Sequence, residues 1–288
     1  DTFWSLDIET VSRYENIVLG YAVKAQRDYN SLTFGSSTGS DRVYNHFDSN
    51  ASWSRVSDKR YKEEIVDSPL LDSIYYKYSD LPFYMFKEYI EGRYGQRMDM
   101  LVDKEYYQPI GASSLGYLPL NEVNADQIVP SEIDDYYRHT EIQGYVHDMG
   151  AAMQNGVGGH AGLFSNANDV AKVMQMFIQG GSYGGQQFFL PSTISHFNKR
   201  YYKSENNRRG IGFDKQQFED PGPTCLCASE QSFGHSGFTG TFAWADPAYE
   251  LVYVFLSNRT YPTMENTRIV DTNLRSEIQR IIYKGIIQ

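Results

Sequence analysis

The 288-residue sequence lacks any run of 18 or more apolar residues, so we predict no membrane-spanning segment. Basic residues are also scarce: 26 Lys and Arg stand against 36 Asp and Glu, which leaves a net charge of −10. Nucleic acids and anionic membranes bind basic surfaces, so we expect neither as a partner. The chain starts without methionine and without a basic-then-apolar leader pattern, and we interpret Asp1 as a processing or cloning boundary.

Cysteine is scarce as well. Its two copies, Cys225 and Cys227, have one residue between them, which is tight for a disulfide, and two thiolates are too few to bind zinc. We therefore expect a structural or incidental pair of thiols. The six histidines show no i, i+4 pair of the zinc-binding kind, and a site built from His147, Asp148 and His160 is the weaker alternative. We predict no metal and no cofactor.

The sequence does contain enough apolar surface for a folded core. Hydrophobic residues make up 41% of the chain and aromatic residues 15%, mainly 24 Tyr and 16 Phe. This content excludes wholesale disorder, and a tyrosine can bury its ring beside a cleft while its hydroxyl stays hydrogen-bonded. The length lies between that of one domain and that of two.

Residues 1–60 differ in pattern from the rest. Residues 15–25 have the apolar density of one strand, and residues 31–57 are rich in Ser, Gly, Asn and Asp. A polar excursion of this length is uncommon inside a compact domain. We therefore treat residues 1–60 as an unassigned, divergent segment and residues 61–288 as the functional domain.

Apolar periodicity predicts helices in the second part of the chain. The clearest covers residues 168–179 and ends at a Gly-Gly pair, with a stripe of Val170, Val173, Met174, Phe177 and Ile178. Shorter helices are predicted over residues 59–67 and 98–107. Another begins near Pro82 with Asp80 as its N-cap, and should carry on one face Phe83, Phe86 and Ile90. A closing helix over residues 266–283 should bury Val270, Leu274, Ile278 and Ile281.

Two strands are predicted over residues 238–245 and 251–257, joined as an antiparallel hairpin. The second strand is apolar on both faces, so we expect it to be central and covered by helices. Helices packed on a mostly antiparallel sheet define an α+β fold.

Two short motifs place reactive side chains at the ends of these elements. Tyr78, Ser79 and Asp80 precede a helix, where the phenol of Tyr78 can project into a cleft. His235 and Gly237 begin a strand, where a hydrogen-bonding side chain and a bare backbone can flank a substrate. A tyrosine base beside a basic residue is a serine-hydrolase arrangement. A buried tyrosine with a satisfied hydroxyl is the simpler alternative for Tyr78.

Ser236 is not expected to be the nucleophile of an α/β-hydrolase. That motif is Gly-x-Ser-x-Gly between a strand and a helix, and here Phe238 occupies the position of the second glycine. The segment that follows also has the pattern of a strand.

Four segments in order resemble one known family: residues 78–80 (Tyr-Ser-Asp), 144–148 (Gly-Tyr-Val-His-Asp), 158–165 (Gly-Gly-His-Ala-Gly-Leu-Phe-Ser) and 233–241 (Phe-Gly-His-Ser-Gly-Phe-Thr-Gly-Thr). The family is the serine β-lactamase/penicillin-binding-protein superfamily, on its class C-like side. The branch that the sequence is most similar to is that of serine hydrolases fused behind family 3 glycoside hydrolases in bacterial cell-wall metabolism.

This resemblance implies a mostly antiparallel sheet flanked by helices plus a helical subdomain, with the active site between them. It implies an acyl-enzyme formed on a serine, no cofactor, and a substrate that is a β-lactam, a peptide, an ester or a muropeptide amide. It further implies an upstream glycoside hydrolase domain as a partner in the same polypeptide, and a place in the periplasm or at the surface of a bacterium.

The resemblance also assigns roles to catalytic residues. Tyr78 matches the proton shuttle of the family's Tyr-x-Asn motif, and Asp80 stands where Asn is common, which removes an amide donor. His235 matches the lysine of the family's Lys-Thr-Gly strand, although histidine is only partly charged near neutrality.

Asp80 and four further residues are assigned to substrate binding by the same resemblance. Ser236 and Gly237 complete the strand motif, and the backbone N–H of Phe238 would supply an oxyanion-hole donor. His160 belongs to the glycine-rich turn that would lie beside the site.

The sequence departs from the family at the nucleophile, which is a Ser followed three residues later by Lys. No serine of the chain has this spacing: Ser73 has Lys77 at +4, and Ser57 has Arg60 at +3. Three hypotheses follow. The chain is the C-terminal portion of a serine hydrolase, with its length reflecting the missing nucleophile; or it is an inactive module that binds peptidoglycan or a peptide; or residues 1–60 are a divergent start with an unconventional nucleophile.

Overall fold

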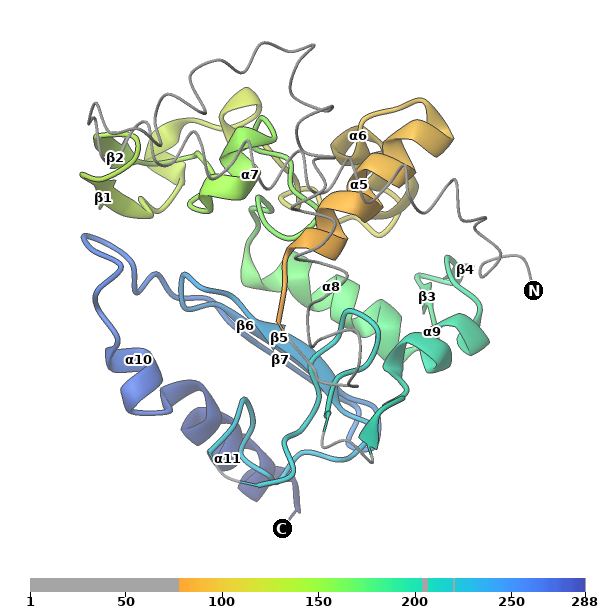
Figure 1. Cartoon of the computed structure of the whole chain (residues 1–288). Coiled ribbons are helices and arrows are strands. Elements are labelled where there is room, and N and C mark those ends of the chain that lie inside the picture. The colour runs from red at the N-terminus through yellow and green to blue at the C-terminus, as the bar shows by residue number, and fades with distance from the viewer. Residues whose placement is uncertain (1–77, 204–206, 220, 288) are drawn as a thin grey trace, which may run out of the picture. The chain divides into compact units, whose positions relative to one another are not determined.

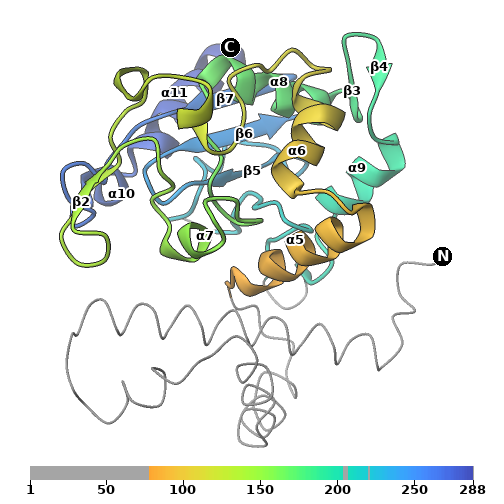
Figure 2. The same cartoon turned by 90° about the horizontal axis from the view of Figure 1, so that it is seen from above.

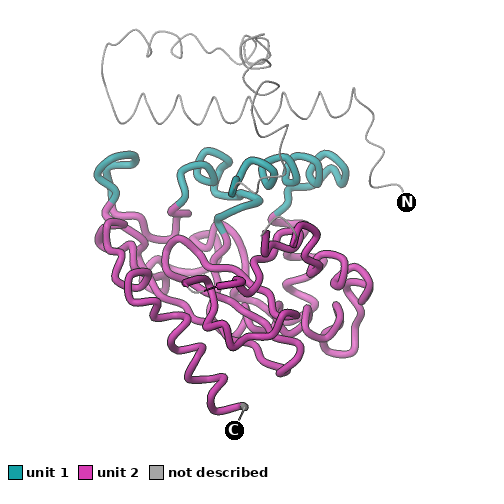
Figure 3. The backbone as a smooth tube through the Cα atoms, turned by 60° about the horizontal axis from the view of Figure 1, so that its bottom comes forward, with its two compact units in different colours: residues 1–98, 134–140, 148–162 teal, residues 99–133, 141–147, 163–288 magenta. Residues whose placement is uncertain are grey.

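The computed structural model describes residues 78–203, 207–219 and 221–287, which fall into two compact units (Figure 3). The first unit contains the described residues up to Met98 together with Asp134–Thr140 and Asp148–Gly162. The second contains Asp99–Ile133, Glu141–His147 and the chain from Leu163 onward. The expected strand over residues 15–25, the polar segment 31–57 and the helix over 59–67 lie outside the described residues.

Two helices come first in the chain, followed by a short strand pair, two more helices and a hairpin. A further helix, the three strands of the main sheet and two closing helices complete the order (Figure 1). The helices are α5 (Leu81–Tyr94), α6 (Met98–Val102), α7 (Met149–Met153), α8 (Ala167–Ile178), α9 (Pro191–Asn198), α10 (Arg268–Asp271) and α11 (Leu274–Ile287). Single-turn helices are η1 (Asp103–Tyr107), η2 (Pro119–Asn121) and η3 (Ala125–Gln127). The strands are β1 (Glu132–Asp134), β2 (Thr140–Ile142), β3 (Ser182–Tyr183), β4 (Gln186–Gln187), β5 (Phe233–Ser236), β6 (Phe242–Asp246) and β7 (Leu251–Phe255).

Helix α5 of the first unit begins where the sequence predicts, but it buries another face. Asp80 occupies the N-cap position without a side-chain capping bond, while Ser79 Oγ accepts a hydrogen bond from the N–H of Leu81 at 3.3 Å. Phe86 is exposed and Lys87 is buried, with its ammonium 2.9 Å from Glu91. Phe83 and Phe86 share the expected face, with ring centroids 6.1 Å apart, but the buried residue is Lys87, because a lysine stem can cover apolar surface while its charge stays paired.

The second unit is built on a three-stranded antiparallel sheet in the order β5-β6-β7 (Figure 2). Strands β6 and β7 form the predicted hairpin, with Phe242 opposite Phe255 and Asp246 opposite Leu251. The first strand starts at Phe242 rather than at Phe238, and in the described part of the chain β6 is the central strand instead of β7. The expected α+β fold is confirmed.

Helices cover both faces of this sheet (Figure 1). On one face, Met174 of α8 packs on Phe233 and Ala245, with Val170 and Phe177 beside it. The other face carries a cluster of Trp244, Phe242 and Tyr253. Ile278 and Ile282 of α11 pack against this cluster. Neighbouring residues of β6 contribute to opposite clusters, Trp244 to one and Ala245 to the other, because successive side chains of a strand point to opposite faces.

Helix α8 matches its prediction to within one residue at each end. Asn166 caps it by accepting a hydrogen bond from the N–H of Asp169 at 3.0 Å. Gly180 and Gly181 follow with φ of +65° and +88°, a region that favours glycine. The predicted helix over residues 98–107 is also present, although its second half is the π-helical turn η1.

The closing helix differs from its prediction because it is broken. Asn273 adopts φ of +50° between α10 and α11, and this break changes the phase of the apolar stripe. Val270, Leu274 and Ile281, expected in the core, are exposed. The buried positions include Ile269 before the break and Tyr283 after it.

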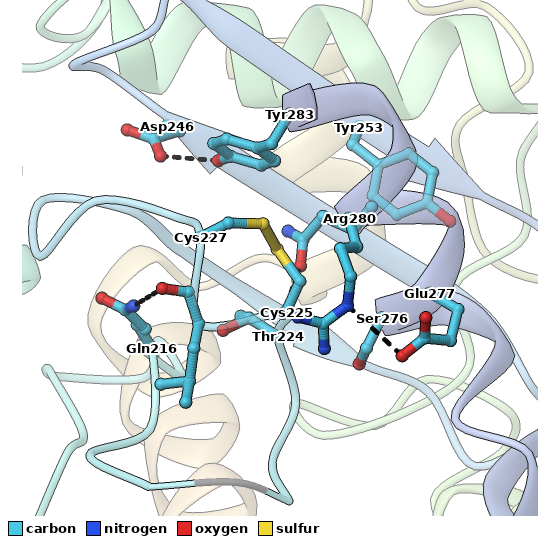
Figure 4. Close-up of a disulfide and its surroundings, with 12 residues drawn as sticks. Gln216, Thr224, Cys225, Cys227, Asp246, Tyr253, Ser276, Glu277, Arg280 and Tyr283 are labelled. Carbon is cyan, nitrogen blue, oxygen red and sulfur yellow. Dashed lines mark hydrogen bonds and ion pairs between the residues drawn. A yellow bond between two sulfur atoms is a disulfide. The ribbon is translucent and has the colours of Figure 1, made fainter. Parts of the chain in front are cut away.

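Cys225 and Cys227 form a disulfide, which corrects the expectation of a pair of thiols (Figure 4). Their Cα atoms lie 5.2 Å apart, a common separation for a disulfide. Leu226 between them adopts φ of +58°, which turns the chain enough for the two sulfurs to meet. The bond packs against Tyr283 of α11, whose hydroxyl donates to the buried carboxylate of Asp246 at 2.6 Å.

Among the residues that the structure describes, none of the helices is both long enough and apolar enough to cross a membrane.

Candidate active site

The end of strand β5 forms the core of the candidate site in the second unit. Asp214 pairs with Gly234 as an isolated antiparallel bridge, which places Asp214 beside β5. The carboxylate of Asp214 is buried and binds Arg208 in a bidentate manner, with N···O distances of 2.6 and 2.9 Å. The Nε atom of Arg209 lies 3.3 Å from the same carboxylate. Asp214 therefore fixes both arginines next to the strand motif.

Arg209 contacts the imidazole of His235. Its Nη1 lies 2.8 Å from His235 Nε2. A guanidinium can only donate, so in this contact the imidazole accepts through the lone pair of Nε2. Its proton is then on Nδ1, which donates to the carbonyl of Ser236 at 2.7 Å. The positive charge at this strand end belongs to Arg209, while His235 supplies a fixed, polarised imidazole.

The rest of the strand motif leaves hydrogen-bonding groups available. Gly237 donates its N–H to the carbonyl of Thr241 at 2.8 Å, and a Cβ at Gly237 would collide with Thr241 Oγ1. No group of the described residues accepts from the N–H of Phe238 or bonds to Oγ of Ser236. These two groups can bind a substrate oxygen.

Phe238 is exposed, and two residues hold its ring. The imidazole of His147 stacks on it with centroids 5.5 Å apart, and the guanidinium of Arg259 lies 4.5 Å from the ring centre. Arg259 Nε also donates to the carbonyl of Phe238 at 2.8 Å. His147 Nε2 lies 2.8 Å from the buried carboxylate of Glu132, whose other oxygen accepts from the N–H of Met264. Both the ring and the backbone of Phe238 are thus held in place.

The other predicted catalytic residue, Tyr78, belongs to the first unit. It is the first described residue and is 58% exposed, so the alternative of a buried structural tyrosine is wrong. Asp80 is half-buried at the start of α5, and its carbonyl accepts from the N–H of Phe83 at 3.0 Å.

His160, also in the first unit, is held by a carboxylate and a phenol. Its Nε2 lies 2.7 Å from Asp148, which also caps α7 by accepting from the N–H of Ala151. The ring of Tyr84 lies 4.6 Å from that of His160. Burial raises the pKa of Tyr84 to about 12, helped by the charges of Asp148 and Asp80, so its hydroxyl stays protonated. The first unit therefore brings His160 together with Asp148 and Tyr84.

The zinc alternative built from His147, Asp148 and His160 receives no support from the described residues. Each histidine has its own carboxylate, Glu132 for His147 and Asp148 for His160. No group of three or more His, Cys, Asp or Glu side chains suited to a metal ion occurs in the part of the chain that the structure describes.

Several residues of these sites were not predicted from the sequence, namely Arg208, Arg209, Asp214, Arg259, Glu132 and Tyr84. Arg209 lies 26 positions before His235, and nothing in the local pattern links the two. The adjacent pair Arg208-Arg209, followed five residues later by Asp214 in an acidic chain, is the signal that could have been noticed. Tyr84 follows Asp80 by one helical turn, which places both at the start of α5.

Helices packed on an antiparallel sheet define an α+β class, and comparison with known proteins identifies the family. The family model described as Beta-lactamase matches residues 36–274. The chain therefore belongs to the β-lactamase family, within the superfamily of serine β-lactamases and penicillin-binding proteins.

Individual relatives are bacterial. A protein of Escherichia coli (strain K12) named "Putative D-alanyl-D-alanine carboxypeptidase" is 33% identical over 197 residues, which are 64% of this chain and 45% of the relative. A protein of the same name from Salmonella agona is 31% identical over 205 residues, or 67% of this chain and 47% of the relative. The chain thus spans about half the length of the curated relatives it matches. A β-lactamase structure from Mycobacterium bovis covers 67% of this chain and 63% of its own, with 15% identity and a TM-score of 0.44.

Proposed function

We propose that the protein is a serine hydrolase that cleaves an amide bond of a peptidoglycan-type peptide through an acyl-enzyme. Membership of the β-lactamase family and the names of the two relatives support this class of substrate. The single observation that carries the proposal is the end of β5, where Arg209 and His235 flank the open N–H of Phe238.

In this proposal the carbonyl oxygen of the substrate accepts a hydrogen bond from Phe238 N–H, which stabilises the oxyanion of the tetrahedral intermediate. Ser236 Oγ binds a polar group of the substrate backbone. Arg209 attracts a negative charge of the substrate, such as a carboxylate, and its bond to His235 fixes the motif. His160 borders the substrate through the turn that it stabilises with Asp148.

Tyr78 is proposed as the general base that takes the proton of the nucleophilic serine and returns it to the leaving amine. Its side chain is 58% exposed. Asp80 is proposed to contact the substrate from the same helix start. The nucleophile itself is not assigned, because no serine of the sequence has Lys three residues later.

Labelling with a fluorescent penicillin and a fluorophosphonate tests the proposal. We expect stoichiometric uptake of a probe by one serine, which mass spectrometry of the labelled peptide identifies. Tyr78→Phe should abolish labelling, whereas the matched control Tyr94→Phe, an exposed tyrosine of α5, should label like the wild type. Equal labelling of both variants would refute the role of Tyr78.

A second candidate function is a catalytically inactive module that binds peptidoglycan or a peptide. The absence of the Ser-x-x-Lys spacing from the sequence favours it. It predicts no labelling by either probe but measurable binding of a muropeptide by calorimetry, which Arg209→Ala should weaken by about tenfold or more.

Two wider assignments belong to the same proposal. We propose that the protein works in the periplasm or at the cell surface of a bacterium, where peptidoglycan lies, and that a family 3 glycoside hydrolase domain precedes it in the polypeptide. Residues 61–288 are proposed as the hydrolase domain, with residues 1–60 unassigned. Fractionation of the native host and the mass of the native polypeptide test both.

A further inference from the structure

A hollow of about 530 Å³ opens in the second unit, away from the residues assigned above. Its apolar wall includes Ile178 of α8, Ile194 of α9 and Phe233 of β5. Phe233 is the first residue of β5, whereas His235 and Ser236 lie at the end of that strand. The hollow and the candidate site therefore draw on opposite ends of the same strand.

The lining of this hollow is strongly basic. Four of its residues are cations, namely Lys199, Arg200, Lys203 and Lys215, and one is an acid, Glu230, which leaves an excess of three positive charges. The whole chain carries −10, so the local charge is opposite to the global one. Glu230 lies at the exposed rim, where its carboxylate is 3.1 Å from Lys203.

Lys215 is a buried cation without a counter-ion. Its side chain is almost fully enclosed, and its ammonium donates to Asn198 Oδ1 and, at 2.9 Å, to the carbonyl of Ser232. Among the described residues no carboxylate lies within 4.0 Å of it. Burial, reinforced by the charge of Arg200, lowers the pKa of Lys215 to about 8.

Arg200 has an unused donor beside this lysine. Its Nη2 donates to the carbonyl of Gln216 at 2.7 Å, and its guanidinium lies 5.1 Å from the ring centre of Phe218. Its Nε is buried and has no hydrogen-bond acceptor in the described part of the chain. Buried charges in proteins are normally paired, because an unpaired one loses its hydration without compensation.

We propose that this hollow binds a small organic anion. Its carboxylate or phosphate group would lie among the cations of Arg200, Lys203 and Lys215, while its apolar body would lie along Ile178, Ile194 and Phe233. Because the hollow shares no residue with the candidate active site, the proposal does not depend on the proposed hydrolase function.

Calorimetric titration at constant ionic strength tests the contributions of the charged head group and of the apolar body separately. We expect hexanoate or hexyl phosphate to bind with a Kd below about 1 mM. Hexanol, which lacks the charge, and inorganic phosphate, which lacks the apolar body, should each bind at least about tenfold more weakly. The tighter of the first two identifies the head group as carboxylate or phosphate. The proposal is overturned when neither binds more tightly than hexanol.

Variants locate the binding. Arg200→Gln should weaken binding of the tighter probe by about tenfold or more. The matched control Lys284→Gln, an exposed cation of α11 outside the hollow, should bind like the wild type. Lys203→Gln, at the exposed rim, is a second test that leaves the buried groups intact and should weaken binding less. Unchanged affinity in both Arg200→Gln and Lys203→Gln would place the anion elsewhere and refute the site.

Discussion

At the scale of single residues, Asp214 links the two basic regions of the second unit. Its carboxylate binds Arg208 and Arg209, and its backbone pairs with Gly234 on β5. The next residue along the chain, Lys215, lines the proposed anion site. One buried acid thus holds the arginine of the candidate active site and directly precedes in the chain the lysine of the hollow.

The tautomer of His235 provides a direct test of its bond to Arg209. We predict that neutral His235 carries its proton on Nδ1, because Nε2 accepts from the guanidinium at 2.8 Å. Long-range ¹H–¹⁵N spectra of protein labelled at histidine measure this, with His235→Gln to assign the signal. Arg209→Ala should leave the proton on Nδ1, which still donates to the carbonyl of Ser236 at 2.7 Å, but should shift the Nε2 signal because its donor is lost. A signal that is Nε2-protonated in the wild type would contradict the arrangement.

Lys215 should make stability depend on pH in an unusual direction. The folded state releases this proton above about pH 8, whereas the unfolded state holds it to about pH 10.5. Between these values the unfolded state binds more protons, so the free energy of unfolding should rise with pH, by at most about 3 kcal/mol. Urea unfolding from pH 7.5 to 10.5 measures this as the difference between wild type and Lys215→Met. A constant difference would show that the amine is not shifted.

At the scale of elements, α11 offers a matched pair of substitutions. Ile278 packs on the cluster around Trp244, whereas Ile281, one turn further, is 70% exposed. Ile278→Ala should lower the free energy of unfolding by about 1–2 kcal/mol, since the site is half-buried. Ile281→Ala should change it by less than about 0.5 kcal/mol. Chemical denaturation of both variants measures this. Equal losses in the free energy of unfolding would mean that Ile281 is buried.

The disulfide should contribute modestly to stability. It closes a loop of only three residues, so chain-entropy arguments give about 1.5 kcal/mol, well below the value for a long loop. Cys225→Ser with Cys227→Ser should lower the free energy of unfolding by that amount, and reduced wild type should behave alike. A loss twice as large would mean that the bond also holds the contacts with Tyr283.

A helix could be predicted from the sequence where a periodic apolar stripe lies between a capping residue and a glycine stop. Helix α8 has its cap at Asn166 and its stop at Gly180, and its stripe is as expected. The closing helix lacks such a signal: Asn273 in a left-handed conformation splits it and rotates the stripe. In α5 the buried Lys87 could not be foreseen, because its burial depends on Glu91 as a partner for its charge.

At the scale of the whole molecule, the sequence motifs propose which short segments carry the site, and the family model covers all of these segments. The residues that complete it are distant in sequence: Arg209 reaches His235 because Asp214 pairs with β5, and Glu132 reaches Met264 across 132 positions. Such contacts depend on strand pairing and loop packing, which no local pattern of one sequence encodes.

The net charge of the whole chain predicts its solubility. With 36 acidic and 26 basic residues and an isoelectric point near 5.1, the protein should be least soluble close to pH 5, where repulsion between copies vanishes. Turbidity of a concentrated sample across pH 4–8 measures this. A solubility minimum above pH 6 would imply that buried groups shift the overall charge.

The Cys225–Cys227 bond has a practical consequence for preparing the protein. Glutathione and thioredoxin keep most cysteines reduced in the bacterial cytosol, whereas the periplasm oxidises them. Material made in an ordinary cytosolic expression strain would therefore emerge as the dithiol, and export to the periplasm or an oxidising strain would yield the bridged form. Free-thiol titration of each batch should precede any comparison of activity between preparations.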